Sequence, residues 1–249
     1  MAKDRLDVIL SKRGLAPSRE KAKALIMAGQ IYVDKERVSK PDKLVTEEAW
    51  IEVRGNLIPY VSYGGVKLES ALKAFGIGVN DKKVLDIGSS TGGFVDCLLQ
   101  HGASLVYAID VGTHQLHDRL RNDKRVILKE NVNARYVTFE DIGEKFEIIT
   151  IDVSFISLRK ILPAVLPFID KGACIISLVK PQFEVGRYEV GKGGIVKDEQ
   201  KIKRTVDSIK EYGVTIGLTP IGETEAPREK ERKNKEYFVL WELQAPQNL

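Results

Sequence analysis

From residue 83 onward, short apolar runs alternate with stretches of helical periodicity, and this alternation restricts the possible folds more than any other feature of the sequence. The apolar runs are rich in Val, Ile and Leu, which favours strands buried on both faces. The predicted strands cover residues 83–88, 105–110, 125–130, 146–152, 173–179, 214–220 and 235–243. Predicted helices lie between most of them, at residues 93–102, 114–121, 157–169 and 198–213. We therefore expect a largely parallel sheet with helices packed on both faces.

The last two predicted strands differ from the others, because the segment between them, residues 221–234, is too irregular for a helical crossover. These two strands are expected to be antiparallel neighbours. A doubly wound α/β sheet that ends in one antiparallel strand has the Rossmann-like layout of class I methyltransferases. That layout, together with a small α+β domain at the N-terminus, is the predicted fold class.

The N-terminal tract, residues 1–55, has a pattern of its own. Ser18 is placed to cap a short amphipathic helix, and Gly29 is placed to end it. Short strand patterns follow that helix. Residues 56–62 are the predicted linker, and residues 63–249 form the predicted larger domain.

Positive charge is concentrated at the N-terminal end of the chain. The protein has 39 Lys and Arg against 35 Asp and Glu, and residues 1–55 hold 12 of the basic residues but only 9 of the acidic ones. This excess favours a polyanionic partner for the tract, although a solvated helix face would have the same composition. The basic residues around the predicted helix start are Lys12, Arg13, Arg19, Lys21 and Lys23.

Composition argues against several other classes of protein. The sequence has no apolar run near the roughly 20 residues that span a bilayer, and the first residues lack the apolar core of a signal peptide. The two cysteines indicate no disulfide framework. His114 and His117 have no third ligand beside them in the sequence, so no metal site is expected. We expect a cytoplasmic protein without stable membrane insertion, and the sequence leaves its oligomeric state open.

A glycine-rich turn, VLDIGSSTGGF, follows the first predicted strand and opens a helix. Such a turn brings backbone N–H groups close to a ligand at a helix N-terminus. Its spacing matches neither the dinucleotide motif nor the P-loop. Asp86 at the strand tip would repel a pyrophosphate but would suit the ammonium and sulfonium groups of S-adenosylmethionine. The candidate cofactor-binding residues of the turn are Gly88, Ser89, Ser90, Gly92, Gly93 and Phe94.

Polar residues also end the following predicted strands. Asp110 is placed to accept hydrogen bonds from both hydroxyls of the cofactor ribose, and Asn131 to bond near the adenine. Asp152, which ends the fourth predicted strand, is a further cofactor candidate. The carboxyl ends of the strands in a doubly wound sheet lie at one edge, where such folds bind ligands.

Two lysines and two acids are expected around the same cleft. Lys180 ends the fifth predicted strand, next to Asp152 at the end of the fourth. Lys67 opens the helix before the first strand, and Glu236 begins the last strand. Each of these residues alone has an ordinary interpretation as a solvated tip or a salt bridge, whereas the four together indicate a catalytic cluster.

Five blocks of the sequence resemble the signature blocks of the TlyA, or hemolysin A, family, and the match covers nearly the whole chain. These blocks are YVSYGGVKLESAL, DIGSSTGGF, DVSFISL, LVKPQFEVG and VGKGGIVKD. The tract RLDVILSKRGLAPSREKAKALIMAGQIYV resembles the ribosomal S4-like RNA-binding module. Two positions depart from the family pattern: Tyr63 stands where the family often has arginine, and Lys233 stands where a glycine usually precedes the asparagine.

The resemblance implies an S-adenosylmethionine-dependent methyltransferase that acts on the ribose 2′-hydroxyl of cytidine in ribosomal RNA. It also implies the Lys-Asp-Lys-Glu tetrad of FtsJ-type enzymes, which carries over to Lys67, Asp152, Lys180 and Glu236. The N-terminal basic residues then become RNA contacts. The glycine-rich segment 186–198, with Arg187, Lys192 and Lys197, is expected to be a mobile loop that closes over RNA.

The chemistry of the ribose explains why two lysines would be needed. A 2′-hydroxyl is a poor nucleophile until its proton is removed, and a lysine can remove that proton only as the neutral amine. Burial and a second lysine nearby both favour the neutral amine. Lys180, at the end of a buried strand, is therefore the expected base, and Lys67 is the like-charged neighbour. Asp152 and Glu236 would orient the two ammonium groups.

Two other functions remain open at this point. One is an RNA-binding protein whose methyltransferase fold is vestigial, but the tetrad and the glycine turn are both intact. The other is a membrane-active hemolysin, as one family name implies, but the sequence contains neither a spanning segment nor a signal peptide.

Overall fold

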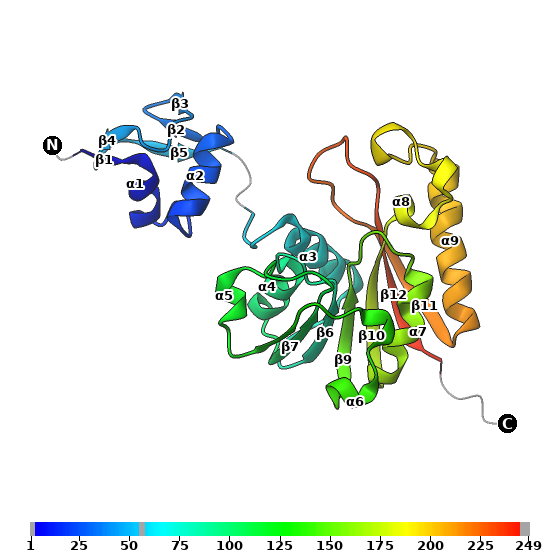
Figure 1. The fold of residues 1–249 in the computed structure, drawn as a ribbon. Coiled ribbons are helices and arrows are strands. Elements are labelled where there is room, and N and C mark those ends of the chain that lie inside the picture. Colours follow the sequence, from blue (N-terminus) through cyan, green and yellow to red (C-terminus); the bar gives the residue numbers. More distant parts are fainter. Residues whose placement is uncertain (1–2, 55–57, 245–249) are drawn as a thin grey trace. The chain divides into compact units, whose positions relative to one another are not determined.

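The computed structural model describes residues 3–54 and 58–244, apart from the side chain of Arg187. The chain falls into two compact units, Met1–Leu57 and Ile58–Leu249, which are both drawn in Figure 1.

The N-terminal unit packs two short helices against small sheets. Its core is built from buried aliphatic side chains on both helices and on the strands. Ser18 Oγ accepts a hydrogen bond from the N–H of Lys21 and caps the second helix, as predicted. Gly29 follows this helix with φ +70°, which also agrees with the prediction. The elements are β1 (Lys3–Arg5), α1 (Leu6–Lys12), α2 (Arg19–Met27), β2 (Ile31–Val33), β3 (Glu36–Val38), β4 (Leu44–Thr46) and β5 (Ile51–Val53).

The second unit is built on a seven-stranded sheet in the order β11-β12-β10-β9-β6-β7-β8 (Figure 1). β12 is antiparallel to both of its neighbours, β10 and β11, and the other neighbouring pairs are parallel. The strands are β6 (Lys83–Ile87), β7 (Leu105–Ile109), β8 (Val126–Lys129), β9 (Phe146–Ile151), β10 (Ile169–Val179), β11 (Leu218–Glu225) and β12 (Tyr237–Leu243). The predicted fold class, a doubly wound sheet that ends in one antiparallel strand beside a small N-terminal domain, is therefore confirmed.

Alternation along the strands places apolar side chains in a separate core on each face of the sheet. Val84 packs in one core with side chains of α3 (Tyr63–Phe75) and α4 (Gly93–Gln100). Its neighbour Leu85 packs in the other core, with side chains of α7 (Leu162–Val165) and α9 (Glu199–Thr215). Both faces of the sheet are thus covered, and the ends of the strands are left as the place for a site. The remaining short helices are α5 (Asp118–Arg121), α6 (Phe139–Ile142) and α8 (Pro181–Glu184).

Three predicted elements differ from those observed. The predicted helix at residues 157–169 is broken into α7 and flanking 3-10 turns, because Pro163 and Pro167 cannot donate backbone hydrogen bonds. The predicted helix at residues 114–121 is reduced to the single turn of α5.

The third difference concerns the predicted strand at residues 214–220, which begins only at Leu218 because α9 continues to Thr215. Gly213 was the expected stop of this helix. Instead it lies inside the helix, where a Cβ would be 2.2 Å from the indole of Trp241. The glycine is therefore needed for close packing of α9 against β12.

Among the helices of the described residues, none is both long and apolar enough to cross a bilayer.

Candidate active site

Two adjoining cavities lie where the parallel strands end. One, of about 560 Å³, is bordered by the N-terminus of α3, the glycine turn and the loop between β11 and β12. The other, of about 420 Å³, lies beside the ends of β6 and β7. Gly88, Ser90, Asp152 and Ser154 line both cavities, so that the two form one continuous cleft.

The structure brings the four predicted catalytic residues to the larger cavity as two ion pairs. Lys180 Nζ lies 2.5 Å from Asp152 Oδ1 and donates a hydrogen bond to Ser154 Oγ at 3.0 Å. Because β9 and β10 are parallel neighbours, residues that follow directly on the two strands meet at the same edge. Only 11% of the Lys180 side chain is exposed, so its amine is shielded from bulk water.

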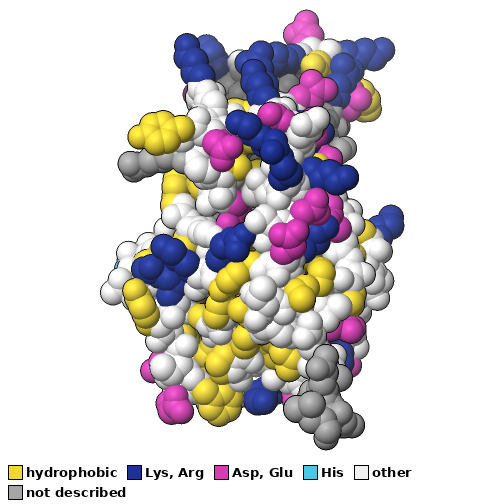
Figure 2. All heavy atoms as spheres, turned by 90° about the vertical axis from the view of Figure 1, so that its right-hand side faces the viewer, with side chains coloured by type: hydrophobic (Ala, Val, Ile, Leu, Met, Phe, Trp, Pro, Cys, Tyr) yellow, Lys and Arg dark blue, Asp and Glu magenta, His cyan; other side chains and the backbone are white. Residues whose placement is uncertain are grey.

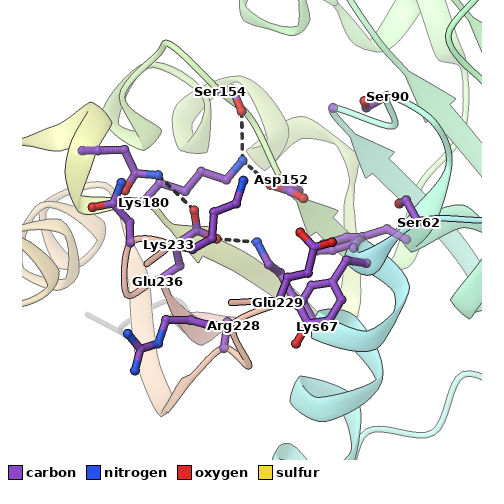
Figure 3. A pocket seen from close by; sticks show the side chains of 18 of the residues that line it. Ser62, Lys67, Ser90, Asp152, Ser154, Lys180, Arg228, Glu229, Lys233 and Glu236 are labelled. Carbon is purple, nitrogen blue, oxygen red and sulfur yellow. Dashed lines mark hydrogen bonds and ion pairs between the residues drawn. The ribbon is translucent and has the colours of Figure 1, made fainter. Parts of the chain in front are cut away.

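The second ion pair joins residues that are far apart in the sequence. Lys67 Nζ, on the first turns of α3, lies 2.5 Å from Glu236 Oε2, which immediately precedes β12. The other carboxylate oxygen of Glu236 accepts a hydrogen bond from Gln182 Nε2 at 2.9 Å. Figure 3 shows Lys67 and Lys180 reaching into the same cavity from different elements. Ser154 and Gln182, which orient the cluster, were not singled out in the sequence.

The glycines of the turn let the backbone pack closely against different neighbouring groups. A Cβ on Gly88, whose φ is +87°, would lie 2.4 Å from the carbonyl oxygen of Asp152. A Cβ on Gly93 would lie 2.2 Å from Ser62 Oγ, so this glycine lets α4 pack closely against the start of α3. Gly92 faces Leu116 and Leu120 instead of the cavity. Two of the three positions thus border the cleft, and the third serves packing.

Hydrogen-bonding groups of the turn remain available to a ligand. Ser89 Oγ is buried, lines the larger cavity and has no hydrogen-bond partner among the described residues. Asp110 accepts the N–H of Ser90 with one carboxylate oxygen and the N–H of Gly112 with the other, each at 2.7 Å. The carboxylate thereby fixes the turn, and Asp110 also lines the smaller cavity. Each carboxylate oxygen can accept a further hydrogen bond. Phe94 lines the larger cavity.

Asp86 lies behind the cleft and lines neither cavity. It is fully buried, and its Oδ1 accepts a hydrogen bond from Thr150 Oγ1 at 2.6 Å, while its Oδ2 has no partner among the described residues. Burial, with smaller contributions from the carboxylates of Asp152 and Asp110, raises the pKa of Asp86 to about 7. The negative charge at this position therefore depends on pH near neutrality.

The smaller cavity has apolar walls that suit a flat ring. Val111, which is 70% exposed, Val132 and Ala134 contribute to these walls. Asn133 provides a polar group among them. Asn131, the residue singled out in the sequence, lines a neighbouring hollow on the other side of the loop instead. The loop after β8 thus brings a polar side chain to the smaller cavity two residues later than the sequence indicated.

Phe155 is an exposed aromatic side chain that lines the smaller cavity. It is 90% exposed, its φ is +63°, and its ring centroid lies 4.9 Å from that of Phe183. The Phe183 ring in turn lies 6.0 Å from Lys180 Nζ. A left-handed backbone is uncommon for a bulky residue and indicates a functional constraint. The sequence block DVSFISL contains this residue, but no sequence pattern reveals its backbone conformation.

Three of the five predicted N-terminal RNA contacts also hold the N-terminal unit together. Arg19 pairs with the buried Asp7 at 3.0 Å, Lys12 pairs with Asp4 at 2.8 Å, and Arg13 donates to the carbonyl of Ala49. The side chains of Arg19 and Lys12 nevertheless remain 50% and 59% exposed. Lys21 and Lys23 are partly buried on α2.

The basic residues of segment 186–198 have a different setting. Lys192 and Lys197 are exposed, whereas the side chain of Arg187 lies outside the described part of the structure. Gly193 and Gly194 of the same segment line the larger cavity. Figure 2 shows the molecule from the side of α9 and β11, where basic, acidic and apolar side chains are intermixed.

The strand order, the glycine turn at the end of the first parallel strand and the acidic residues at successive strand ends define a class I methyltransferase. Residues 60–243 match the family of FtsJ-like methyltransferases, and residues 4–51 match the S4 domain. The chain therefore belongs to the FtsJ-like methyltransferase family and carries an S4 domain before its catalytic unit.

Similar proteins come from several bacteria. The chain is 43% identical over 238 residues to the 16S/23S rRNA (cytidine-2'-O)-methyltransferase TlyA of Mycobacterium tuberculosis (strain CDC 1551 / Oshkosh), covering 95% of this chain and 88% of that one. It is 53% identical over 197 residues to YqxC of Bacillus subtilis (strain 168), provisionally named an rRNA methyltransferase, covering 79% and 70% of the two chains. A solved structure from Streptococcus thermophilus, provisionally named a hemolysin, is 40% identical with a TM-score of 0.75, and the match covers 98% and 90% of the two chains.

Proposed function

We propose that the protein transfers a methyl group from S-adenosylmethionine to the ribose 2′-hydroxyl of a cytidine in ribosomal RNA. The observation that carries this proposal is the pair of shielded lysine–carboxylate contacts, Lys180 with Asp152 and Lys67 with Glu236, at one cavity. The Mycobacterium tuberculosis relative, a 16S/23S rRNA (cytidine-2'-O)-methyltransferase by name, supports both the nucleoside and the class of RNA.

The residues of the cleft fit each part of the proposed cofactor. The apolar walls around Val111, Val132 and Ala134 suit an adenine ring, and Asp110 can accept from ribose hydroxyls. Ser89 Oγ, which has no partner in the described part of the chain, and the N-terminus of α4 suit the carboxylate of the methionine part. When bound there, the cofactor would supply an electrophilic methyl group.

Lys180 would act as the base that takes the proton of the 2′-hydroxyl. Asp152 and Ser154 hold its amine by an ion pair and a hydrogen bond, so that its direction is fixed before RNA arrives. The Lys67 ammonium opposes a second positive charge in the same cavity, and Glu236 and Gln182 keep it in place. The cluster thus provides one proton acceptor and one fixed cation, which would stabilise the developing alkoxide. Alignment of the hydroxyl with the methyl group accounts for much of the remaining rate.

Phe155 would hold the base of the target nucleotide. Its exposed ring offers a stacking surface next to the cavity, and a stacked base is worth about 1–3 kcal/mol. Stacking on a side chain suits a nucleotide that has left a helical stack, because its π-face is then uncovered. The S4 domain, with Arg19 and Lys12 still half exposed, would position the RNA through phosphate contacts.

Transfer of labelled methyl groups tests the proposal. The protein is incubated with methyl-labelled S-adenosylmethionine and bacterial ribosomal subunits or their purified RNA. We expect label in RNA with the wild-type protein and none with Lys180→Ala, while calorimetry gives similar cofactor affinity for both proteins. Failure of the wild-type protein to bind the cofactor would instead favour an RNA-binding protein with a vestigial methyltransferase fold. Cofactor binding without transfer to any ribosomal RNA would contradict the proposed substrate.

A further inference from the structure

A single side-chain amide, that of Asn234, joins two loops that border the larger cavity. Asn234 lies in the loop between β11 and β12. Its Oδ1 accepts the N–H of Val196, and its Nδ2 donates to the carbonyl of Gly194, both at 2.9 Å. We call this pair of hydrogen bonds the Asn234 bridge. It connects the β11–β12 loop with the turn formed by residues 191–196.

The turn at residues 191–196 has little of its own to hold it in place. Gly193 and Gly194 both have φ +77°, a conformation that glycine adopts at little cost. Two hydrogen bonds, from Gly194 N–H to the Gly191 carbonyl and from Gly191 N–H to the Ile195 carbonyl, close the turn internally at 3.1 Å. Val196 is its one well-buried side chain, at 4% exposure. The Asn234 bridge is therefore a large part of what fixes the turn to the catalytic unit.

The same turn forms one wall of the cavity that holds the catalytic cluster. Gly193, Gly194 and Ile195 line this cavity together with Lys67, Lys180 and Glu236. The exposed Lys192 lies directly beside the lining residues. The wall thus combines open backbone with the exposed cation of Lys192, for which the described residues provide no ion-pair partner, and this combination suits the sugar–phosphate backbone of an RNA strand.

Residues on the C-terminal side of Asn234 continue the connection. Lys235 Nζ lies 2.7 Å from Glu199 Oε1 at the start of α9. Glu236 then accepts from both Lys67 and Gln182. Three consecutive residues therefore fix the turn at residues 191–196, the start of α9 and the Lys67 ammonium. A displacement of Asn234 would move the carboxylate that orients Lys67.

We propose that Asn234 is a positioning residue that fixes the RNA-facing wall of the cavity and the Lys67–Glu236 pair as one unit. The two hydrogen bonds of the Asn234 bridge go to Val196 and Gly194 and not to a catalytic lysine. Asn234 therefore acts through the turn and through Glu236. The activity part of this inference rests on the proposed RNA methylation. The existence of the bridge does not, because it can be measured without RNA.

Two substitutions at Asn234 and one control test the inference in the full chain. Asn234→Ala removes both bonds. Asn234→Asp keeps an acceptor for the N–H of Val196 but loses the donor to Gly194. Asn122→Ala is the matched control, because Asn122 also donates its amide to a carbonyl, that of Asp118, at the exposed end of α5.

The first readout is amide hydrogen exchange, which reports the bridge in the absence of RNA. We expect the Val196 amide to exchange about tenfold faster or more in Asn234→Ala, because loss of its hydrogen bond makes local opening of the turn easier. Asn234→Asp should stay near the wild-type rate at Val196, and Asn122→Ala should match the wild type there. Wild-type exchange at Val196 in Asn234→Ala would overturn the inference.

The second readout separates positioning from a purely structural role. At saturating ribosomal RNA, kcat of Asn234→Ala should fall about tenfold or more, because misplacement of reacting groups by a small distance has large effects on rate. The dissociation constant of the cofactor should stay within about twofold, since Asn234 bonds to Val196 and Gly194, and neither is among the residues proposed to hold the cofactor. Asn234→Asp should recover part of kcat. An unchanged kcat in Asn234→Ala, with faster exchange at Val196, would overturn the positioning role.

Absence of methyl transfer by the wild-type protein would contradict the proposed function instead. The exchange rate of Val196 in Asn234→Ala would still decide whether the bridge exists.

Discussion

Asp7 in the N-terminal unit and Asp86 in the catalytic unit are both fully buried, but they are satisfied in different ways. Asp7 receives hydrogen bonds from Arg5 at 2.9 Å and from Arg19 at 3.0 Å. The Arg5 hydrogen bond, together with that of Arg19, lowers the pKa of Asp7 below its ordinary value. Asp86 has the hydroxyl of Thr150 on one oxygen, no described partner on the other, and a pKa raised to about 7.

The difference separates charge used for folding from charge retained for a ligand. A buried carboxylate with two guanidinium partners stabilises the unit that contains it at neutral pH. A buried carboxylate without a counterion destabilises the fold once it is ionised. Asp86 is best explained by the cationic ligand proposed for the neighbouring cleft, since perturbed carboxyl groups cluster at functional sites. The charges of the Lys180 and Lys67 ion pairs are likewise assigned to the site and not to folding.

Lys180→Arg should have the largest effect on activity. Arginine keeps a positive charge beside Asp152, but its guanidinium does not lose a proton in proteins and cannot act as a base. We expect methyl transfer to fall by roughly a thousandfold or more, with cofactor binding and the folded structure preserved. Single-turnover transfer assays measure the rate, and hydrogen exchange checks the fold. Substantial activity in Lys180→Arg would show that Lys180 supplies charge and not proton transfer.

Asp7→Asn should show the opposite behaviour, with a large effect on folding and none on the chemical step. The substitution weakens two charge-assisted hydrogen bonds, although solvent partly screens the half-exposed arginines. Because the N-terminal unit is small, we expect faster hydrogen exchange throughout α1 and α2 but unchanged exchange in the catalytic unit. Asp42→Asn, at an exposed position of the same unit, is the control. Equal exchange in both variants would contradict the role given to Asp7.

The same residue gives the N-terminal unit a defined dependence on pH. The pKa of Asp7 is lowered in the folded state, so its stabilising contribution is present above the ordinary pKa of about 3.9. This contribution is lost as the pH falls through the lowered pKa. Acid should therefore unfold the wild-type unit along a steeper pH profile than Asp7→Asn.

Phe155→Asn should weaken RNA binding while leaving stability unchanged or slightly higher. Asparagine accepts the left-handed backbone more readily than phenylalanine but offers no ring for stacking. Loss of one stacked base predicts an increase of about tenfold in KM for RNA. Phe155→Tyr keeps the ring and is the matched control. A wild-type KM for RNA in Phe155→Asn would contradict the proposal that a base stacks on this side chain.

The smallest expected effect is the pH dependence of cofactor affinity. Asp86 should be mostly protonated at pH 6 and mostly ionised at pH 8, because its pKa is about 7. A cationic ligand favours the ionised form, so affinity should fall by up to about tenfold from pH 8 to pH 6. Calorimetry of the wild type and of Asp86→Asn measures this effect, and the variant should bind more weakly without this dependence. Identical pH profiles for the two proteins would contradict the assignment.

The sign of the stability effect is opposite for Asp86. Its folded pKa lies above its ordinary value of about 3.9, so the folded state binds the extra proton between that value and about 7. The contribution of this group to the free energy of unfolding therefore falls as the pH rises through this window. Asp86→Asn should remove this loss and give a more stable protein above pH 7.

The succession of strands and the position of the site follow from patterns that can be read in the sequence. Apolar runs that end in Asp110, Asp152 and Lys180 identify one edge of a parallel sheet, and the structure has that edge. Asp86 lies one residue before the end of β6 and is buried behind the cleft. The pairing of Lys67 with Glu236 could be expected from resemblance but not from spacing, because the two residues are 169 positions apart.

The residues missed by the sequence depend on the shape of loops. Gln182 reaches Glu236 because Pro181 starts the short helix α8, and Phe155 is exposed because its backbone is left-handed. Asn133 lines the smaller cavity in place of Asn131 because Asn131 itself has φ +56° and donates its backbone N–H to the carbonyl of Gly112. Neither composition nor periodicity encodes such details, since each depends on one or two dihedral angles.

The position of the transferred methyl group tests the central claim most directly. Ribosomal RNA treated with the protein and S-adenosylmethionine is digested to nucleosides and examined by mass spectrometry, with Lys180→Arg as the parallel sample. We expect 2′-O-methylcytidine in the wild-type sample, resistance of the adjoining phosphodiester to alkali, and neither signal with the variant. A methyl group on a base, or 2′-O-methylation of equal extent with Lys180→Arg, would contradict the claim.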